Sequence, residues 1–294
     1  MANNIPEIWS RFYNRVGRIF NRQLRLSCDL IVASDVITDL EPLGNKYSPG
    51  VTKAGRLSCS GYLNGRKVKV YSALRPEQVA LRLAVQSLSN GKWGFPEVVA
   101  HDHALIAEAW VDGVGVAQSG PPGRKLAEAA VHAFLQGCWH DQRFSEIASE
   151  NSRAFCYLED YLLPRFGVWR HLSVVSEFVD AWQRMYEQAS LPIMLSHADL
   201  SADNVFIETG TNRVMFIDNE LLGVGMGWIL DPLNSFLGDD FDVVKEAPVP
   251  IDRGFVELTW ALRKAGSAFD AGEPGRAVEL MRAALARFEK GGAR

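Results

Sequence analysis

The sequence has few cysteines and no long apolar segment. Its four cysteines are spread along 294 residues without a C-x-x-C pair. Structural zinc sites usually take ligands in close pairs, so we expect no structural metal, and the thiols read as reduced cysteines of a cytosolic protein. No apolar run approaches the ~18 residues of a membrane span, and the N-terminus lacks a secretory apolar segment. We therefore expect a cytoplasmic protein. The cysteines are Cys28, Cys59, Cys138 and Cys156.

An excess of one charge is also missing. Thirty-one basic and thirty-five acidic residues leave a formal net charge of -4, which argues against a dedicated nucleic-acid coat, because such proteins are basic as a whole. We expect no nucleic-acid partner. At 47% hydrophobic and 22% charged residues, the composition is that of a soluble globular protein and excludes a disordered chain, a collagen-like fibre and a disulfide miniprotein. The length fits one large or two modest domains.

Residues 5–27 predict an amphipathic helix, which with its connector forms an N-terminal segment, 1–41. Apolar residues recur at helical spacing on one side, and five arginines cover the other. One interpretation docks this helix on its own protein or on a second subunit as a homodimer contact. The other rests it on an anionic lipid surface, as a peripheral contact at the inner face of the membrane. The arginines are Arg11, Arg15, Arg18, Arg22 and Arg25.

The region that follows predicts a β-sheet. Arg56–Leu63 alternates with period two, Asn64-Gly65 is a strong hairpin signal, and Lys67–Tyr71 reads as the return strand. Pro76–Leu88 predicts a helix with proline in its first turn. Two more strands are expected at 98–100 and 105–111.

After Asp112-Gly113 the chain is mainly helical. Strands are expected at 204–208 and 213–218 only. A β-rich part followed by an α-rich part predicts an α+β fold of two lobes. The expected helices cover 125–139, 159–166, 173–188, 232–237, 254–264 and 276–290.

Residues 195–220 contain the pattern that points to chemistry. His197-x-Asp199 is followed by Asn204, then by a strand, a Thr-Gly-Thr-Asn turn, and a second strand that ends at Asp218. This is the spacing of a kinase catalytic loop with a second acidic residue after the next strand. A hairpin places Asn204 and Asp218 at the same end of a small sheet.

Each of these residue types suits phosphoryl transfer. Asp199 is the candidate catalytic base, because a carboxylate near the acceptor hydroxyl can orient it and take its proton. Asn204 and Asp218 are candidate ligands of Mg²⁺, a hard cation that prefers oxygen. A helix cap or an Asx turn is the structural alternative for Asp199 and Asn204. His197 is a candidate catalytic residue whose expected role is to hold the loop by packing and hydrogen bonding.

The motif resembles the aminoglycoside phosphotransferase and choline kinase superfamily, which has the protein-kinase-like fold. The resemblance runs from about residue 50 to 264, with its specific motifs in 195–235. It implies a small β-rich N-lobe (42–111), a larger helical C-lobe (112–294) and a nucleotide between them. Asp218-Asn219-Glu220 is more like choline kinases than like the Asp-Phe-Gly of protein kinases. No Ala-Pro-Glu follows, which favours a small-molecule acceptor over a protein.

The resemblance also implies roles for four further residues. Glu220 is a third candidate metal ligand or a carboxylate that orients the acceptor. The structural alternative is that it lies in solvent at the end of a strand. Lys69 is the candidate contact for the nucleotide phosphates, with Lys67 on the same face as the competing choice. Glu77 is the candidate ion-pair partner of Lys69, or only a partner of the helix dipole.

Three more segments correspond to the superfamily's pattern. The backbone near Ala107 and Ala109 would meet the adenine edge. The loop 48–55 lies where the nucleotide cover is expected, yet it lacks G-x-G-x-x-G. Asp231-Pro232 is expected to begin a helix, with Asp231 as its N-cap. In the superfamily this aspartate also braces the catalytic loop.

The sequence therefore predicts an ATP- and Mg²⁺-dependent phosphotransferase acting on a hydroxyl of a small molecule: an aminoglycoside, an amino alcohol or a sugar. Asp239, Asp240 and Asp242 could bind a cationic acceptor, or form a solvated loop. The alternatives are a kinase of a lipopolysaccharide or other glycolipid sugar at the membrane, and a pseudokinase binding module. A metal-dependent phosphohydrolase is disfavoured, since other His/Asp ligand pairs are lacking.

Overall fold

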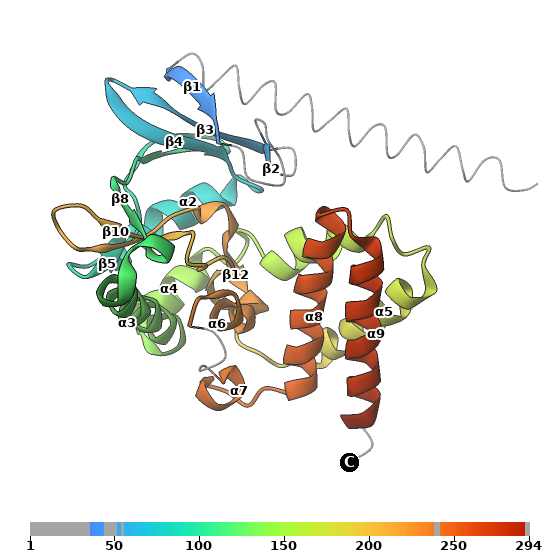
Figure 1. Cartoon of the computed structure of the whole chain (residues 1–294). Coiled ribbons are helices and arrows are strands. Elements are labelled where there is room, and N and C mark those ends of the chain that lie inside the picture. Colours follow the sequence, from blue (N-terminus) through green and yellow to red (C-terminus); the bar gives the residue numbers. More distant parts are fainter. Residues whose placement is uncertain (1–35, 44–51, 54–55, 238–241, 292–294) are drawn as a thin grey trace, which may run out of the picture. The chain divides into compact units, whose positions relative to one another are not determined.

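The computed structural model describes residues 36–43, 52–53, 56–237 and 242–291. The predicted helix at 5–27, most of the 48–55 loop, Asp239 and Asp240 lie outside these ranges. The chain divides into two compact units, residues 1–74 with 97–110 and residues 75–96 with 111–294 (Figure 1). Residues 75–96 thus group with the second unit, whereas the predicted boundaries assign them to the N-lobe. The division after residue 110 lies next to the predicted one.

The first unit is an antiparallel sheet with the strand order β1-β3-β4-β7-β6, and β2 pairs with β3. Asn64 and Gly65 join β3 to β4 with positive φ angles of 50° and 78°, so the predicted two-residue hairpin is confirmed. Figure 1 shows β3 and β4 as a long ribbon. The strands are β1 (Thr38–Pro42), β2 (Thr52–Lys53), β3 (Arg56–Leu63), β4 (Arg66–Ser72), β6 (Val98–Asp102) and β7 (Leu105–Ala109).

The two faces of β4 differ, as its alternation predicts. Val68 and Val70 are buried in a core with Leu57 and Cys59 of β3. The opposite face carries Lys67, Lys69 and Tyr71, because successive side chains of a strand point to opposite sides. Each buried valine removes apolar surface worth roughly 1.5–3 kcal/mol from water. The sheet is therefore held by one apolar face, which leaves the lysines for the other.

The second unit contains all the α-helices of the described chain. Its helix α5 matches the predicted 173–188, and α8 packs beside α9 (Figure 1). Helix α4 was not predicted. The helices are α2 (Glu77–Ala84), α3 (Gly120–His140), α4 (Gln142–Glu150), α5 (Ser173–Gln188), α6 (Asp231–Asn234), α7 (Val243–Glu246), α8 (Arg253–Asp270) and α9 (Pro274–Gly291).

Residues 159–166 depart from the predicted α-helix. Tyr157–Leu162 forms a π-helical turn, η3, and Leu163–Phe166 continues as a 3-10 turn, η4. Pro164 accounts for the change, since it has no N–H to donate and its ring obstructs the carbonyl one turn earlier. π-Helical turns of this kind are frequent at functional sites.

Two small sheets of the second unit support the catalytic-loop motif. One has the order β5-β11-β10-β8, and the other pairs β12 with β9. Together with the first unit they confirm the predicted order, an antiparallel sheet followed by a mainly helical region. Among the described residues no helix is both long and apolar enough to cross a membrane. The strands are β5 (Trp93–Gly94), β8 (Gly113–Gly115), β9 (Met194–His197), β10 (Val205–Glu208), β11 (Val214–Phe216) and β12 (Leu222–Gly225).

Candidate active site

The predicted catalytic loop lies between β9 and the β10–β11 hairpin. Val205 pairs with Phe216, and the Ile217 N–H donates to the Asn204 carbonyl at 2.9 Å. This register places Asn204 and the chain leading to Asp218 at one end of the hairpin. The Asn204 side-chain amide donates to the Asp199 carbonyl at 3.0 Å, which ties that end to the loop. The structure thus brings Asn204 to Asp199 as the spacing predicts.

His197 is completely buried and holds the loop through both ring nitrogens. The Asn219 amide nitrogen donates to the Phe216 carbonyl at 3.2 Å, so its oxygen faces His197 Nε2 at 3.1 Å as an acceptor. His197 Nε2 therefore carries the proton. Nδ1 is then left to accept the Asp199 N–H, at 3.4 Å. Burial lowers the pKa of His197, which keeps the ring neutral and this tautomer in place.

Asp231 braces the same loop from α6. Its carboxylate accepts the Ser196 hydroxyl at 2.9 Å and the His197 N–H at 2.8 Å, and it is fully buried. Burial raises the pKa of Asp231 to about 7, against the two hydrogen bonds, which lower it. The predicted N-cap role is wrong. Leu230 occupies that position, and the carboxylate makes no cap, because both of its oxygens are engaged with β9.

Asp218 has left-handed backbone angles, φ 60° and ψ 47°, a conformation that short polar residues such as aspartate adopt most readily. Because the Asn204 amide nitrogen is used by the loop, its oxygen is left for a cation. No group of three His, Cys, Asp or Glu side chains in the described part of the chain forms a complete metal site. One or two carboxylates with an amide oxygen, completed by phosphate and water, is the donor set that Mg²⁺ accepts. The residues fit Mg²⁺ on that basis.

Helix α2 supports the segment after Asp218. The Gln78 amide donates to the carbonyls of Glu220 and Leu222, at 3.2 and 3.1 Å. Glu220 is buried, so it is not the solvated strand end that we considered as an alternative, and its metal role stays a prediction. Glu77 next to Gln78 is exposed. Its role as a partner of Lys69 stays a prediction too.

In the first unit Lys69 has polar neighbours that sequence reasoning missed. It lies opposite Glu108 in the β4–β7 pair, and Tyr71 donates to that buried carboxylate at 2.8 Å. The Lys69 ammonium lies 5.2 Å from the Tyr71 ring centroid. Lys67 instead stacks 4.0 Å over Trp110. The two lysines on this face are thus distinguished by their partners.

The proposed adenine edge belongs to β7. Ala107 has a strand on each side, with Val70 and Ala100 as its partners. The Ala109 N–H, at the end of the strand, donates to Glu97 at 2.8 Å. The adenine contact is untested and stays a prediction.

Sequence reasoning also missed Asn219 and Gln78. A signal existed for Asn219, since this polar residue directly after Asp218, the candidate metal ligand, stands where protein kinases have an aromatic residue. Gln78 gave none, because a glutamine within a helix is common.

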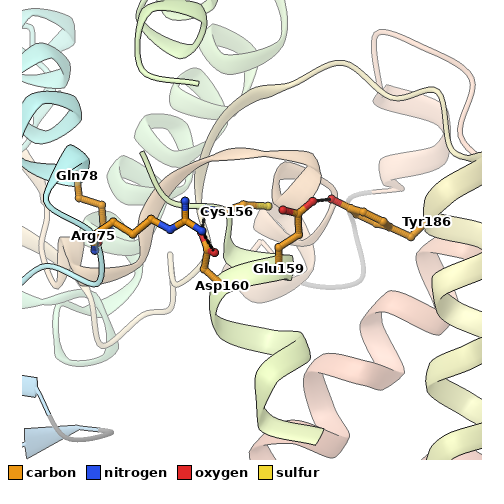
Figure 2. Close-up of polar contacts among 6 residues, drawn as sticks. All are labelled: Arg75, Gln78, Cys156, Glu159, Asp160 and Tyr186. Atoms are coloured by element: carbon orange, nitrogen blue, oxygen red, sulfur yellow. Dashed lines mark hydrogen bonds and ion pairs between the residues drawn. The ribbon is translucent and has the colours of Figure 1, made fainter. Parts of the chain in front are cut away.

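The two acidic side chains of η3, Glu159 and Asp160, form structural contacts. Arg75 pairs with Asp160, whose other oxygen accepts the Cys156 N–H at 2.8 Å, and Tyr186 donates to Glu159 (Figure 2). Asp242, the described member of the predicted acidic run, caps α7 and pairs with Arg253 at 3.1 Å. That hydrogen-bonded arginine lowers the pKa of Asp242.

The structure matches solved phosphotransferases over most of its length. One match is LicA in complex with AMP, with 14% identity and a TM-score of 0.49 over 84% of this chain and 92% of that one. A second is a thermostable mutant of aminoglycoside phosphotransferase APH(4)-Ia with ADP and hygromycin B, with 14% identity and a TM-score of 0.46 over 88% and 98%. A third is the streptomycin–ATP–APH(2″)-IIa ternary complex, with 16% identity and a TM-score of 0.48 over 96% and 99%.

No known family profile matches the chain, and no curated protein is significantly similar to it in sequence. The acceptor must therefore be argued from the residues of this chain.

Proposed function

We propose that the protein transfers the γ-phosphoryl group of ATP to a hydroxyl group of a small molecule. The observation that carries the proposal is the arrangement of the catalytic loop. Asp199 is joined to Asn204 by a hydrogen bond, Asn204 lies at the same hairpin end as the chain that leads to Asp218, and a buried network holds the loop. Such positioning supplies much of the rate in phosphoryl transfer, where the protein does little covalent chemistry.

In this proposal Asp199 orients the acceptor hydroxyl and takes its proton as the oxygen receives the phosphoryl group, with ADP as the other product. Asn204 and Asp218 would hold Mg²⁺, with Glu220 as a further ligand. That ion neutralises developing charge on the phosphates. Lys69 is proposed to contact the nucleotide phosphates, and neutral His197 serves as the support of Asp199 rather than as a base.

The acceptor classes stay those of the sequence analysis: aminoglycoside, amino alcohol or sugar. A glycolipid or lipopolysaccharide sugar is the second candidate, favoured by the five arginines in the sequence of residues 5–27. A pseudokinase is disfavoured, because the sequence retains Asp199, Asn204 and Asp218, the residue types that phosphoryl transfer needs.

Replacing Asp199 tests the proposal. Asp199→Asn should lower acceptor phosphorylation by roughly 10²–10⁴-fold, the usual contribution of a general base, and leave Mg-ATP binding near wild type. Asp218→Ala should instead abolish the Mg²⁺-dependent part of nucleotide binding. Turnover is measured as ADP release with a panel of acceptors, and Mg-ATP binding is measured by calorimetry.

Asp203→Asn is the matched control, since this exposed aspartate of the same loop has no assigned role. Near-wild-type turnover in Asp199→Asn would overturn the assignment of the base. Tight Mg-ATP binding without phosphorylation of any acceptor would support the pseudokinase.

A further inference from the structure

Two tyrosines and two arginines form a cluster beside the candidate active site. The rings of Tyr157 and Tyr161 of η3 lie against each other at a tilt of 32°, with centroids 5.5 Å apart. The Arg165 guanidinium lies 4.0 Å over the Tyr161 ring and hydrogen-bonds its hydroxyl. Arg263 of α8 lies 5.9 Å over the Tyr157 ring. The cluster joins η3, η4 and α8 within the second unit.

Three polar atoms of this cluster are buried without a hydrogen-bond partner in the described part of the chain: Tyr157 Oη, Arg165 Nη1 and Arg263 Nε. Tyr157 as a whole is 1% exposed. All three groups can donate, and the two guanidinium N–H groups can do nothing else. Leaving a buried donor unpaired costs about 1–3 kcal/mol, so three together indicate a missing acceptor.

One other nitrogen of each arginine already has a partner. Arg165 Nη2 pairs with Asp270 at 2.8 Å, and Arg263 Nη1 donates to Ser267 at 2.6 Å. Arg263 has no carboxylate partner among the described residues and is half-buried. Its long side chain therefore offers a positive charge that can still meet a negative one.

The cluster adjoins the catalytic loop. The Val224 N–H of β12 donates to the Phe155 carbonyl at 2.7 Å, and β12 pairs with β9, which leads to Asp199. A Cβ at Gly227 would lie 3.2 Å from both Tyr157 Cβ and Ser196 Oγ. Burial raises the pKa of the Tyr157 hydroxyl. The positive charges of Arg263 and Arg165 lower this pKa, and the negative charge of Asp199 raises it.

Two carboxylates of η3 itself already have partners. Figure 2 shows Asp160 turned to Arg75 and Glu159 turned to Tyr186. Asp242 is paired with Arg253. An approaching ammonium group would find Asp160 already ion-paired and Glu159 already hydrogen-bonded, whereas an oxyanion would find unpaired donors.

We propose that the acceptor carries an oxyanion, a carboxylate or a phosphate, which is bound by Arg165, Arg263 and the Tyr157 hydroxyl while its hydroxyl group faces Asp199. This inference rests on the proposed function and names the acceptor class. Guanidinium groups suit the role because their planar N–H pairs match the geometry of carboxylates and phosphates. The oxyanion supplies the acceptor that the three orphaned donors lack.

Anion binding is tested on the full chain with inorganic phosphate as the probe. Calorimetric titration of phosphate into protein saturated with Mg²⁺ and a non-hydrolysable ATP analogue should give a saturable isotherm. Arg263→Gln should weaken it at least tenfold, which is a typical loss for one charge-assisted contact. Arg276→Gln is the control, because Arg276 is exposed and pairs only with Glu273, and it should bind as wild type.

Tyr157→Phe separates a binding role from a structural one. Removing an unpartnered hydroxyl should leave the free energy of unfolding unchanged or raise it, while phosphate affinity falls severalfold. A hydroxyl that served the fold would instead lower stability when removed. Unchanged phosphate affinity in both Tyr157→Phe and Arg263→Gln would overturn the proposal, as would the lack of a saturable isotherm for wild type.

A matched series of acceptors distinguishes a carboxylate from a phosphate, with ADP release as the readout. The series is glucose, glucuronate, glucose 6-phosphate and glucosamine. One of the two anionic members should bind to the Mg-nucleotide complex at least tenfold more tightly than glucose, and Arg263→Gln should remove that preference. Best binding by glucosamine, insensitive to Arg263→Gln, would overturn the anion site and leave the proposed function standing. If phosphate binds through Arg263 but the protein phosphorylates no acceptor, the anion site is supported and the proposed function is contradicted.

Discussion

At the scale of single residues, the loop depends on the proton of one buried imidazole. Asn219 is oriented by the Phe216 carbonyl, and its oxygen holds the His197 proton on Nε2. Nδ1 can then accept the Asp199 N–H. The opposite tautomer would set two donors against each other at Asp199. Asn219 is therefore a positioning residue that acts on Asp199 through His197.

Asn219→Leu should lower kcat by roughly tenfold to a hundredfold, because it leaves the buried Nε2 proton without an acceptor at a cost of about 1–3 kcal/mol. The KM for ATP should stay near wild type. The ring nitrogen shifts of His197 in NMR should lose the signature of a single tautomer. Asn151→Leu, which also removes a side-chain contact to a backbone carbonyl, is the control.

A double-mutant cycle completes this test. If Asn219 acts through His197, adding Asn219→Leu to His197→Asn should cost little beyond the single change. Additive losses, or an unchanged tautomer in Asn219→Leu, would show that Asn219 acts by another route.

At the scale of elements, one carboxylate joins α6 to β9. Asp231 spans the two by accepting from Ser196 and His197, so the helix and the strand share a buried acid. Since its folded pKa, about 7, lies above its unfolded value of 3.8, the folded state holds the proton more tightly. The stability from this group is fully present below about pH 4 and is lost as the pH rises through 7.

Asp231→Asn should remove that part of the pH dependence. The free energy of unfolding of wild type, relative to the variant, should fall between pH 4 and 7.5, by an amount on the order of 4 kcal/mol for a shift of about three pKa units. Urea unfolding at several pH values measures the difference. His197 contributes in the opposite direction in both proteins, because its lowered pKa costs stability as the pH falls below 6.5. A pH-independent difference would contradict the expectation.

At the scale of the whole molecule, the five arginines in the sequence of residues 5–27 suggest a test of where the protein acts. If the membrane interpretation of residues 5–27 holds, deleting residues 1–27 should leave a folded protein that phosphorylates a soluble acceptor but no longer sediments with anionic vesicles. Binding of the intact chain should weaken with salt, because ions screen arginine–phosphate attraction over about 10 Å at 0.1 M. If the intact chain fails to bind vesicles at low salt, the membrane hypothesis and the glycolipid acceptor lose their support.

Much of the fold could be predicted because its signals are local. Asn64-Gly65 specifies its own turn, the alternation of β4 separates Val68 from Lys69, and the apolar spacing of α5 defines its length. The spacing from His197 to Asp218 likewise identified the catalytic loop, since those residues are close in sequence. Pro164 was a local signal too, but its effect, a π-helical turn, depends on the packing around η3.

What the sequence by itself determined is the two-part order, an antiparallel sheet followed by a mainly helical region, and the residue types of the predicted catalytic loop, because both depend on neighbours along the chain. The expectation of only two strands after Asp112-Gly113 was wrong, since β8, β9 and β12 also lie there. Only the tertiary structure decided that Asp231 does not cap α6, and that Gln78 holds the backbone after Asp218. It also decided that Arg263 lies over Tyr157, 106 positions away in sequence numbering. Such pairs leave no spacing in the sequence, because a buried polar group takes whichever partner the packing of distant elements brings within reach.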